Sequence, residues 1–215
     1  MRKEEVYIIG GGSSLVGFDF NKLKDKDTIV VNKAIFHVPN PTYFITMDYM
    51  FVSNNKEKLR KKRFPKFFVG AINNPYLKYI KGKLTDTRYK MSYDLDMIDV
   101  LIFSKHDAGL GFNFGDFRHG CNSGYCALQL AIILGYKKIH LLGIDLTCTD
   151  KTHFHGGYGR SINNFTKKLN FYIMYFRYAM NLLKKHPEIE IYNCSSISKL
   201  KNLLPYKDIG GYNEI

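Results

Sequence analysis

The sequence predicts a single-domain α/β protein of the Rossmann-like type, with a mainly parallel sheet and helices on both faces. Three observations lead to this prediction. Short runs rich in β-branched and aromatic residues recur along the chain, and helical segments separate several of them. Most of these runs end in glycine or a small polar residue. Finally, a chain of 215 residues of which 45% are apolar has the size of one domain with a full hydrophobic core.

Seven segments have the length and composition of strands. They cover residues 5–9, 28–31, 42–46, 66–69, 99–103, 138–142 and 188–192. Strands that alternate with helices form a parallel sheet, and ligands bind such sheets outside the carboxyl ends of the strands. The residues that directly follow the strands are therefore the first candidates for a site.

Three segments are predicted to be helices. Residues 123–136 are apolar on nearly every face, which is typical of a buried helix, with Ser123 as the expected N-cap and Gly135 as the C-terminal stop. Residues 49–63 read as a basic, partly amphipathic helix, and residues 161–185 as a long helix that ends in a basic turn.

Two further segments interrupt this pattern within a domain that spans residues 1–215. Residues 71–97 are rich in Asn, Tyr, Lys and Asp with weak periodicity, and we expect a lid-like excursion. Residues 146–160 are polar and contain three glycines and two histidines, so we expect a loop that is mobile without ligand and closes over a bound nucleotide.

The charge balance indicates anionic partners, because 32 basic and 19 acidic residues give a net charge of +13. Nucleotide phosphates, a phosphorylated glycan, a membrane surface or nucleic acid all fit. The densest basic run, residues 56–63, is equally well explained as the solvated end of a helix. A nucleic-acid partner has no motif to support it, since the aromatic residues are not interleaved with this run.

Composition also bears on location and on metal binding. No apolar run reaches the ~20 residues that span a bilayer, and the N-terminal segment is too short and too acidic for a signal peptide. We expect a cytoplasmic protein, either free or peripheral to the inner membrane surface. None of the four cysteines is spaced C-x-x-C, and none pairs with a histidine at zinc-finger spacing, so we expect reduced thiols, with Cys126 and Cys194 in the core.

Four strand ends are polar or glycine-rich and can converge on one crevice: residues 10–14, Asn32, Asp48 and Asp145. The first of these is the turn Gly10-Gly11-Gly12-Ser13-Ser14. Its glycines let the backbone approach a phosphate or sugar, which free N–H groups and hydroxyls then bind. The alternative is a tight strand-to-helix turn with no ligand.

Two other segments contribute polar groups near the same crevice. His119-Gly120-Cys121-Asn122-Ser123-Gly124 precedes the buried helix, and a helix N-terminus offers unpaired N–H groups that suit an anion. Gly143-Ile144-Asp145 closes a strand, and its carboxylate can bind ribose hydroxyls, orient a donor or hold a metal. Capping alone would also explain Ser123 and Asp145.

The sharpest chemical feature is the run Thr152-His153-Phe154-His155 with the glycines that follow it. A loop histidine titrates near neutrality and can act as a general base. As an alternative, His153 and His155 together with Asp145 could hold a metal ion. The simplest reading is two exposed loop histidines, but loops beside strand ends commonly carry sites.

Taken together, these segments resemble the sialyltransferase-like glycosyltransferases of bacterial surface glycans, a variant of the GT-A fold. They are also similar to motility-associated and phage-encoded relatives and to archaeal hydroxymethylpterin diphosphokinases. The family's opening strand and glycine turn match residues 8–15, and the asparagine after its second strand matches Asn32. Its helix start, the strand ending in G-I-D and the histidine loop match Ser123-Gly124, residues 143–145 and His153 to His155.

The resemblance implies a transferase that moves a sugar from a nucleotide-activated, CMP-sialic-acid-like donor to a hydroxyl of a glycan or other acceptor. Residues 10–14 and 122–124 are expected to hold the nucleotide, Asn32 and Asp145 its sugar and base, and His155 or His153 to deprotonate the acceptor. Thr147 lies where the family has a tyrosine that stabilises the leaving phosphate, and Tyr158 is the residue expected to substitute. A homo-oligomer and activity without a metal cofactor are also implied.

Two alternatives remain open. A pterin or nucleotide diphosphotransferase on the same fold would need a divalent metal to bridge phosphates, and Asp48 and Asp145 would be its ligands. A phage protein that modifies or binds nucleic acid would explain the net charge, and its binding would weaken steeply with salt.

Overall fold

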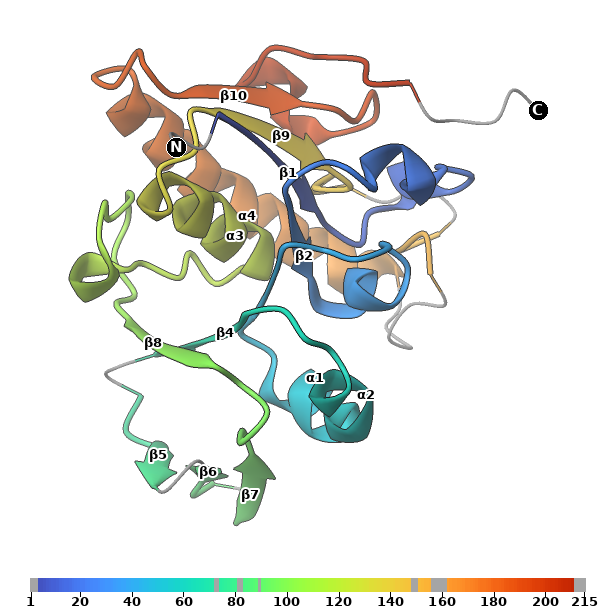
Figure 1. Ribbon diagram of the computed structural model, residues 1–215. Helices are drawn as coiled ribbons and strands as arrows, with labels where there is room; N and C mark the ends of the chain where they lie inside the picture. Colours follow the sequence, from blue (N-terminus) through green and yellow to red (C-terminus); the bar gives the residue numbers. More distant parts are fainter. Residues whose placement is uncertain are drawn as a thin grey trace.

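The computed structural model describes residues 4–71, 74–80, 83–88, 90–147, 151–155 and 162–210, with backbone alone for residues 80, 91 and 162–166. Its centre is a seven-stranded, fully parallel sheet in the order β10-β9-β1-β2-β3-β4-β8 (Figure 1). The strands are β1 (Glu5–Ile9), β2 (Thr28–Val31), β3 (Tyr43–Thr46), β4 (Lys66–Ala71), β8 (Val100–Ser104), β9 (Lys138–Leu142) and β10 (Glu190–Asn193). This confirms the predicted α/β class, and all seven predicted strands are present with ends shifted by at most two residues.

Alternation along the strands divides the apolar residues between two cores. Val6 and Ile8 of β1 point to the face covered by α3 (Ser123–Ile133) and α4 (Ile162–Leu183), and Tyr7 and Ile9 point to the other. That second face is covered by the short 3₁₀ helices η1 (Ser13–Leu15), η2 (Phe20–Leu23) and η3 (Asn32–Phe36), and by α1 (Tyr49–Asn54) and α2 (Lys56–Arg60). Helical cover on both faces fits strands that are apolar throughout.

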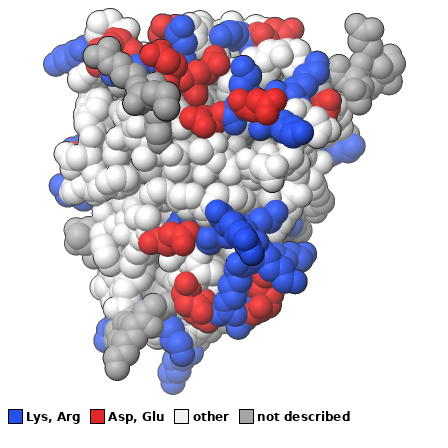
Figure 2. Space-filling model, in the orientation of Figure 1, with Lys and Arg blue, Asp and Glu red and all other residues white. Residues whose placement is uncertain are grey.

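The predicted helix at residues 49–63 is divided into α1 and α2 at Asn55. Leu59 of α2 is fully buried, while the basic residues around it face solvent. Lys and Arg gather on the surface over these helices (Figure 2). Arg60 is paired with Asp94 and Asp96 at 3.3 and 2.6 Å, so part of this charge is neutralised within the chain.

The segment 71–97, predicted as an irregular excursion, contains a small antiparallel sheet. Its strands are β5 (Leu77–Ile80), β6 (Lys83–Asp86) and β7 (Met91–Asp94), at the far end of the molecule beyond β8 in Figure 1. Leu84 and Tyr93 are buried in the same core as α1 and α2. The weak periodicity arises because these strands are short and only partly covered; a lid function for this sheet stays a prediction.

The ends of α3 differ in one respect from the expectation. Asn122, and not Ser123, is the N-cap, and its Oδ1 accepts the N–H of Tyr125 at 3.0 Å. Gly135 adopts a φ of +89° after the last turn, which confirms it as the stop. Among the described residues, η5 (Lys199–Asn202) is the last helical element, and η4 (Phe114–Asp116) lies in the loop before α3. Within the described residues, no helix is both long and apolar enough to cross a membrane.

Candidate active site

A pocket of about 330 Å³ opens at the carboxyl ends of β1, β2, β3 and β9. β1 lies between β2 and β9, and the chain passes from one side of β1 to the other on its way from β8 to β9. This edge is therefore the topological switch point, where open α/β sheets bind ligands.

Most predicted site residues line the pocket: Gly10, Gly11, Gly12, Asn32, Asn122, Ser123, Gly124, Asp145, Thr147 and His153. Ser13, Ser14 and His155 do not line it, and Tyr158 lies outside the described residues.

The glycine turn packs directly against the end of β9. Gly10 N–H donates to the Leu142 carbonyl and Gly12 N–H to the Gly143 carbonyl, both at 2.8 Å. A Cβ on Gly12 would lie 2.3 Å from Asp145 Oδ2, so only glycine fits. Two of the three N–H groups expected to bind a ligand are thus taken by β9, and Gly11 is the one whose N–H has no partner among the described residues.

Asp145, three residues after the end of β9, also holds the glycine turn in place. Its carboxylate is 2% exposed and accepts the backbone N–H of Ser14 at 2.9 Å and the Ser14 hydroxyl at 2.6 Å. Burial raises the pKa of Asp145, and the hydrogen bonds from Ser14 oppose that shift. The carboxylate therefore shapes the pocket floor before any ligand binds.

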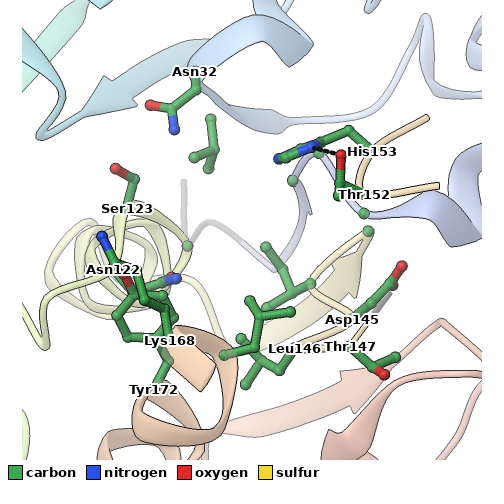
Figure 3. A pocket seen from close by; sticks show the side chains of 18 of the residues that line it. Asn32, Asn122, Ser123, Asp145, Leu146, Thr147, Thr152, His153, Lys168 and Tyr172 are labelled. Atoms are coloured by element: carbon green, nitrogen blue, oxygen red, sulfur yellow. Dashed lines mark hydrogen bonds between the residues drawn. The ribbon is translucent and has the colours of Figure 1, made fainter. Parts of the chain in front are cut away.

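The ends of β2 and β3 are connected by a short polar network. Asn32 has a φ of +51°, and its Oδ1 accepts the Thr46 hydroxyl at 2.6 Å. Thr46 in turn accepts the N–H of Asp48 at 3.0 Å, and Asp48 Oδ1 caps α1 by accepting the N–H of Phe51. With its oxygen held, the Asn32 amide nitrogen points into the pocket (Figure 3).

The N-terminus of α3 forms the wall opposite the histidine loop. Asn122 and Ser123 lie on this side, and Thr152 and His153 lie on the other (Figure 3). The backbone N–H groups of Ser123 and Gly124 have no partner among the described residues, and they add to the positive end of the helix dipole. This wall can accommodate an anion.

Helix α4 contributes two residues that the sequence did not single out, Lys168 and Tyr172. They are four residues apart, so they lie on one helix face, next to Asn122 in Figure 3. Lys168 is exposed and its ammonium has no acidic partner among the described residues. A lysine on the predicted helix 161–185 carries no local signal, because several lysines occur there and only the fold selects the one at the strand ends.

The two loop histidines have different surroundings. His153 lines the pocket, and its Nδ1 lies 3.0 Å from the Thr152 hydroxyl. His155 stacks on His153 with ring centres 4.8 Å apart, and both rings lie close to Gly11. Burial lowers the pKa of His155 to about 3, and the neighbouring His153 contributes to the same shift.

Phe154 holds this stretch of the loop in place. Its N–H donates to the Gly11 carbonyl at 3.1 Å, and its ring packs on Phe20 and His37. Residues 151–155 are thus docked on the glycine turn, which brings His153 to the pocket edge.

The structure does not form the metal sites that the sequence suggested. In the described part of the chain, one group of three or more ligating side chains is close enough to share an ion, and it excludes His153, His155 and Asp145. Asp48 and Asp145 both line the pocket, but Asp48 caps α1 and Asp145 binds Ser14.

Comparison with known proteins agrees with the architecture. No protein-family model matches the chain, and no curated protein matches it significantly in sequence. Among solved structures, the sialyltransferase CstII from Campylobacter jejuni with the substrate analogue CMP-3FNeuAc superposes with a TM-score of 0.55 at 17% identity, over 100% of this chain and 90% of that one. Monomeric CstII gives a TM-score of 0.57 at 18% identity, covering 99% and 89%.

A second sialyltransferase shows the same similarity. The α-2,3-sialyltransferase Cst-I from Campylobacter jejuni gives a TM-score of 0.55 at 16% identity, over 99% of this chain and 83% of that one. These matches cover 99–100% of this chain. The chain therefore has the fold of the Campylobacter sialyltransferases.

Proposed function

We propose that the protein is a glycosyltransferase that uses a cytidine-monophosphate-activated sugar and transfers the sugar to a hydroxyl of a glycan or similar acceptor. The observation that carries this proposal is the pocket at the β1–β9 switch point, in a fold whose solved relatives include CstII bound to CMP and CstII bound to CMP with a trisaccharide acceptor. Both the position of the pocket and its chemistry suit a nucleotide.

Donors for a phosphate gather on one wall of the pocket. The N–H groups of Ser123 and Gly124, which have no partner among the described residues, lie at the positive end of α3, and the exposed Lys168 lines the same pocket. When the bond between the sugar and the CMP phosphate breaks, negative charge grows on the phosphate oxygen. Fixed N–H donors and an ammonium stabilise that charge more than they stabilise the donor in its ground state.

The base is assigned to His153 rather than His155, because His153 is the one that lines the pocket. Nδ1 lies 3.0 Å from the Thr152 hydroxyl, and in the tautomer in which Nδ1 donates to that hydroxyl, Nε2 is the basic nitrogen. Nε2 takes the acceptor hydroxyl proton, the acceptor oxygen attacks the anomeric carbon, and the anomeric carbon–phosphate oxygen bond breaks to release CMP. His155, whose low pKa keeps it neutral at neutral pH, orients the His153 ring by stacking.

The proposal is tested by incubating the protein with CMP-N-acetylneuraminic acid and following CMP release and sugar transfer to a panel of galactose-terminated acceptors. CMP release that depends on enzyme and persists in excess chelator supports the proposal. Absence of both hydrolysis and transfer, with activity appearing only when a divalent metal and a phosphoryl donor are supplied, would replace it by the diphosphotransferase alternative.

A further inference from the structure

A second group of reactive side chains lies at the α3 end of the nucleotide pocket, which one of them, Cys121, also lines. His106 follows β8, while His119 and Cys121 belong to the loop that leads into α3. Each offers one ligand atom, and these three atoms lie within 4.8 Å of one another. The proposed glycosyl transfer uses neither histidine.

The three side chains are in direct contact. His106 Nε2 lies 2.9 Å from Cys121 Sγ, closer than a van der Waals contact, and the His106 and His119 rings are 4.9 Å apart. Gly120 and Cys121 have φ values of +52° and +55°. Left-handed backbone at a cysteine is strained, and here it turns the thiol toward the two imidazoles.

We propose that His106, His119 and Cys121 bind a zinc ion. Two imidazole nitrogens and one thiolate are a ligand set that zinc prefers, whereas magnesium and calcium require oxygen ligands. His119 is buried, so its ring is held in place by the surrounding structure. Sequence spacing did not reveal this ligand set, because His106 follows β8 whereas His119 and Cys121 lie in the loop before α3.

The fourth coordination position faces a neighbouring cavity. His106 and His119 line a cavity of about 670 Å³ whose rim also holds Arg88 and Lys105. Three protein ligands with one open position are the arrangement of zinc sites that bind water or substrate, as opposed to closed structural sites. Asp107 lines the same cavity, and Arg88 and Lys105 are paired with Asp86 and Asp116 at 2.7 and 2.9 Å, so the cavity does not favour an anionic fourth ligand over water.

Binding requires small, specific rearrangements. The thiol proton of Cys121 leaves to water, and zinc–nitrogen and zinc–sulfur bonds at tetrahedral angles separate the two ligand atoms by about 3.6 Å, compared with 2.9 Å for His106 and Cys121 here. The Cys121 N–H donates to His119 Nδ1 at 2.9 Å. Whichever His119 nitrogen coordinates, this hydrogen bond is given up, because coordination through Nε2 places the ring proton on Nδ1. The Tyr175 hydroxyl, 3.3 Å from His106 Nε2, lies beside the site.

The test is a cobalt titration of the full chain after chelator treatment. Cobalt(II) bound through Cys121 gives a thiolate-to-metal charge-transfer band, which zinc abolishes by competition. Cys121→Ser should remove the band, and His106→Ala should weaken binding roughly tenfold or more. His186→Ala, which changes a half-buried histidine outside the cluster, and His153→Ala, at the nucleotide pocket, should leave the band unchanged. Absence of a band in the wild-type chain, or its persistence in Cys121→Ser, overturns the proposal.

A second measurement does not depend on a folded variant. Alkylation of the wild-type protein is mapped by peptide mass spectrometry with and without zinc. Zinc should protect Cys121, whereas Cys126 and Cys194 are buried and should react slowly in both samples. Equal labelling of Cys121 with and without zinc contradicts the site. Neither experiment involves a nucleotide, so the zinc site and the glycosyltransferase assignment can fail separately.

Discussion

Ser14 and Asp145 are separated by 131 residues, yet the Asp145 carboxylate accepts both the backbone N–H and the hydroxyl of Ser14. This pair fastens the glycine turn after β1 to the end of β9. Because β1 and β9 are neighbours at the switch point, the pair fixes the position of the glycine turn at the pocket, which opens at the carboxyl ends of these strands.

Alanine substitutions at Gly11 and Gly12 of the glycine turn should lower the free energy of unfolding by different amounts. Gly12→Ala places a methyl group 2.3 Å from Asp145 Oδ2 and 2.7 Å from the Gly143 carbonyl, whereas Gly11→Ala meets only His153 and His155 side-chain atoms at 3.0 and 3.1 Å. We expect Gly12→Ala to lower the free energy of unfolding by about 1–3 kcal/mol and Gly11→Ala by less. Urea denaturation compares them, with Gly115→Ala, at an exposed loop position, as control; equal losses at positions 11 and 12 would contradict the packing described.

Lys168 should contribute to nucleotide affinity by its charge. Lys168→Gln removes the cation from the pocket, and a charge-assisted contact to phosphate is worth about 1.5–3 kcal/mol, so the Kd for CMP should rise roughly tenfold or more. Lys167→Gln is the matched control, since it removes the same charge from the adjacent helix position outside the pocket. The two Kd values come from calorimetric titration; a similar change in both variants would mean that Lys168 acts only through net charge.

Alanine substitution of His153 and of His155 should lower the rate of sugar transfer by different amounts. Loss of a general base costs roughly 10²–10⁴-fold in rate, and we expect this for His153→Ala with little change in the Kd for CMP. His155→Ala should lower kcat less, because that ring acts only through His153. Single-turnover rates of sugar transfer measure both, and a larger loss of rate in His155→Ala would reverse the assignment.

Buried His119 should make the fold sensitive to mild acid. Burial lowers the pKa of His119 from 6.5 to about 4, so between these pH values the unfolded chain binds more protons than the folded one. Stability therefore falls as the pH is lowered through this range, by about 2 kcal/mol for this group at pH 5.

His119→Asn retains an acceptor for the Cys121 N–H and removes the titrating group. Urea denaturation at pH 7 and pH 5 in the presence of chelator should show a smaller acid loss in this variant than in the wild type. His186→Ala should keep the wild-type dependence. Identical pH dependence in the wild type and His119→Asn would show that His119 does not titrate as described.

The sequence was sufficient to predict the parallel sheet and the polar strand ends, because β-branched runs that end in Gly10, Asn32 and Asp145 carry a local signal. It was not sufficient to predict what these residues contact. Three glycines were read as ligand-binding N–H groups, but two of those groups bond to the end of β9. That distinction depends on strand order, which no local pattern records.

Long-range assembly also explains what sequence reasoning missed. Lys168 lies on α4, far along the chain from the strand ends with which it lines the pocket. His106 and Cys121 meet only because β8 ends beside the loop before α3. Likewise, the described part of the segment 71–97 contains the paired strands β5, β6 and β7, and these strands are too short to show a clear period of two.

The central claim is that the pocket at the carboxyl ends of β1 and β9 binds a cytidine nucleotide. Isothermal titration calorimetry of the full chain with CMP, UMP, AMP and GMP in excess chelator tests it most directly. We predict saturable binding of one CMP per chain, tighter than that of the other three nucleotides and weakened by Lys168→Gln. No binding of CMP at millimolar concentration, or equal binding of all four nucleotides that Lys168→Gln leaves unchanged, would contradict the claim.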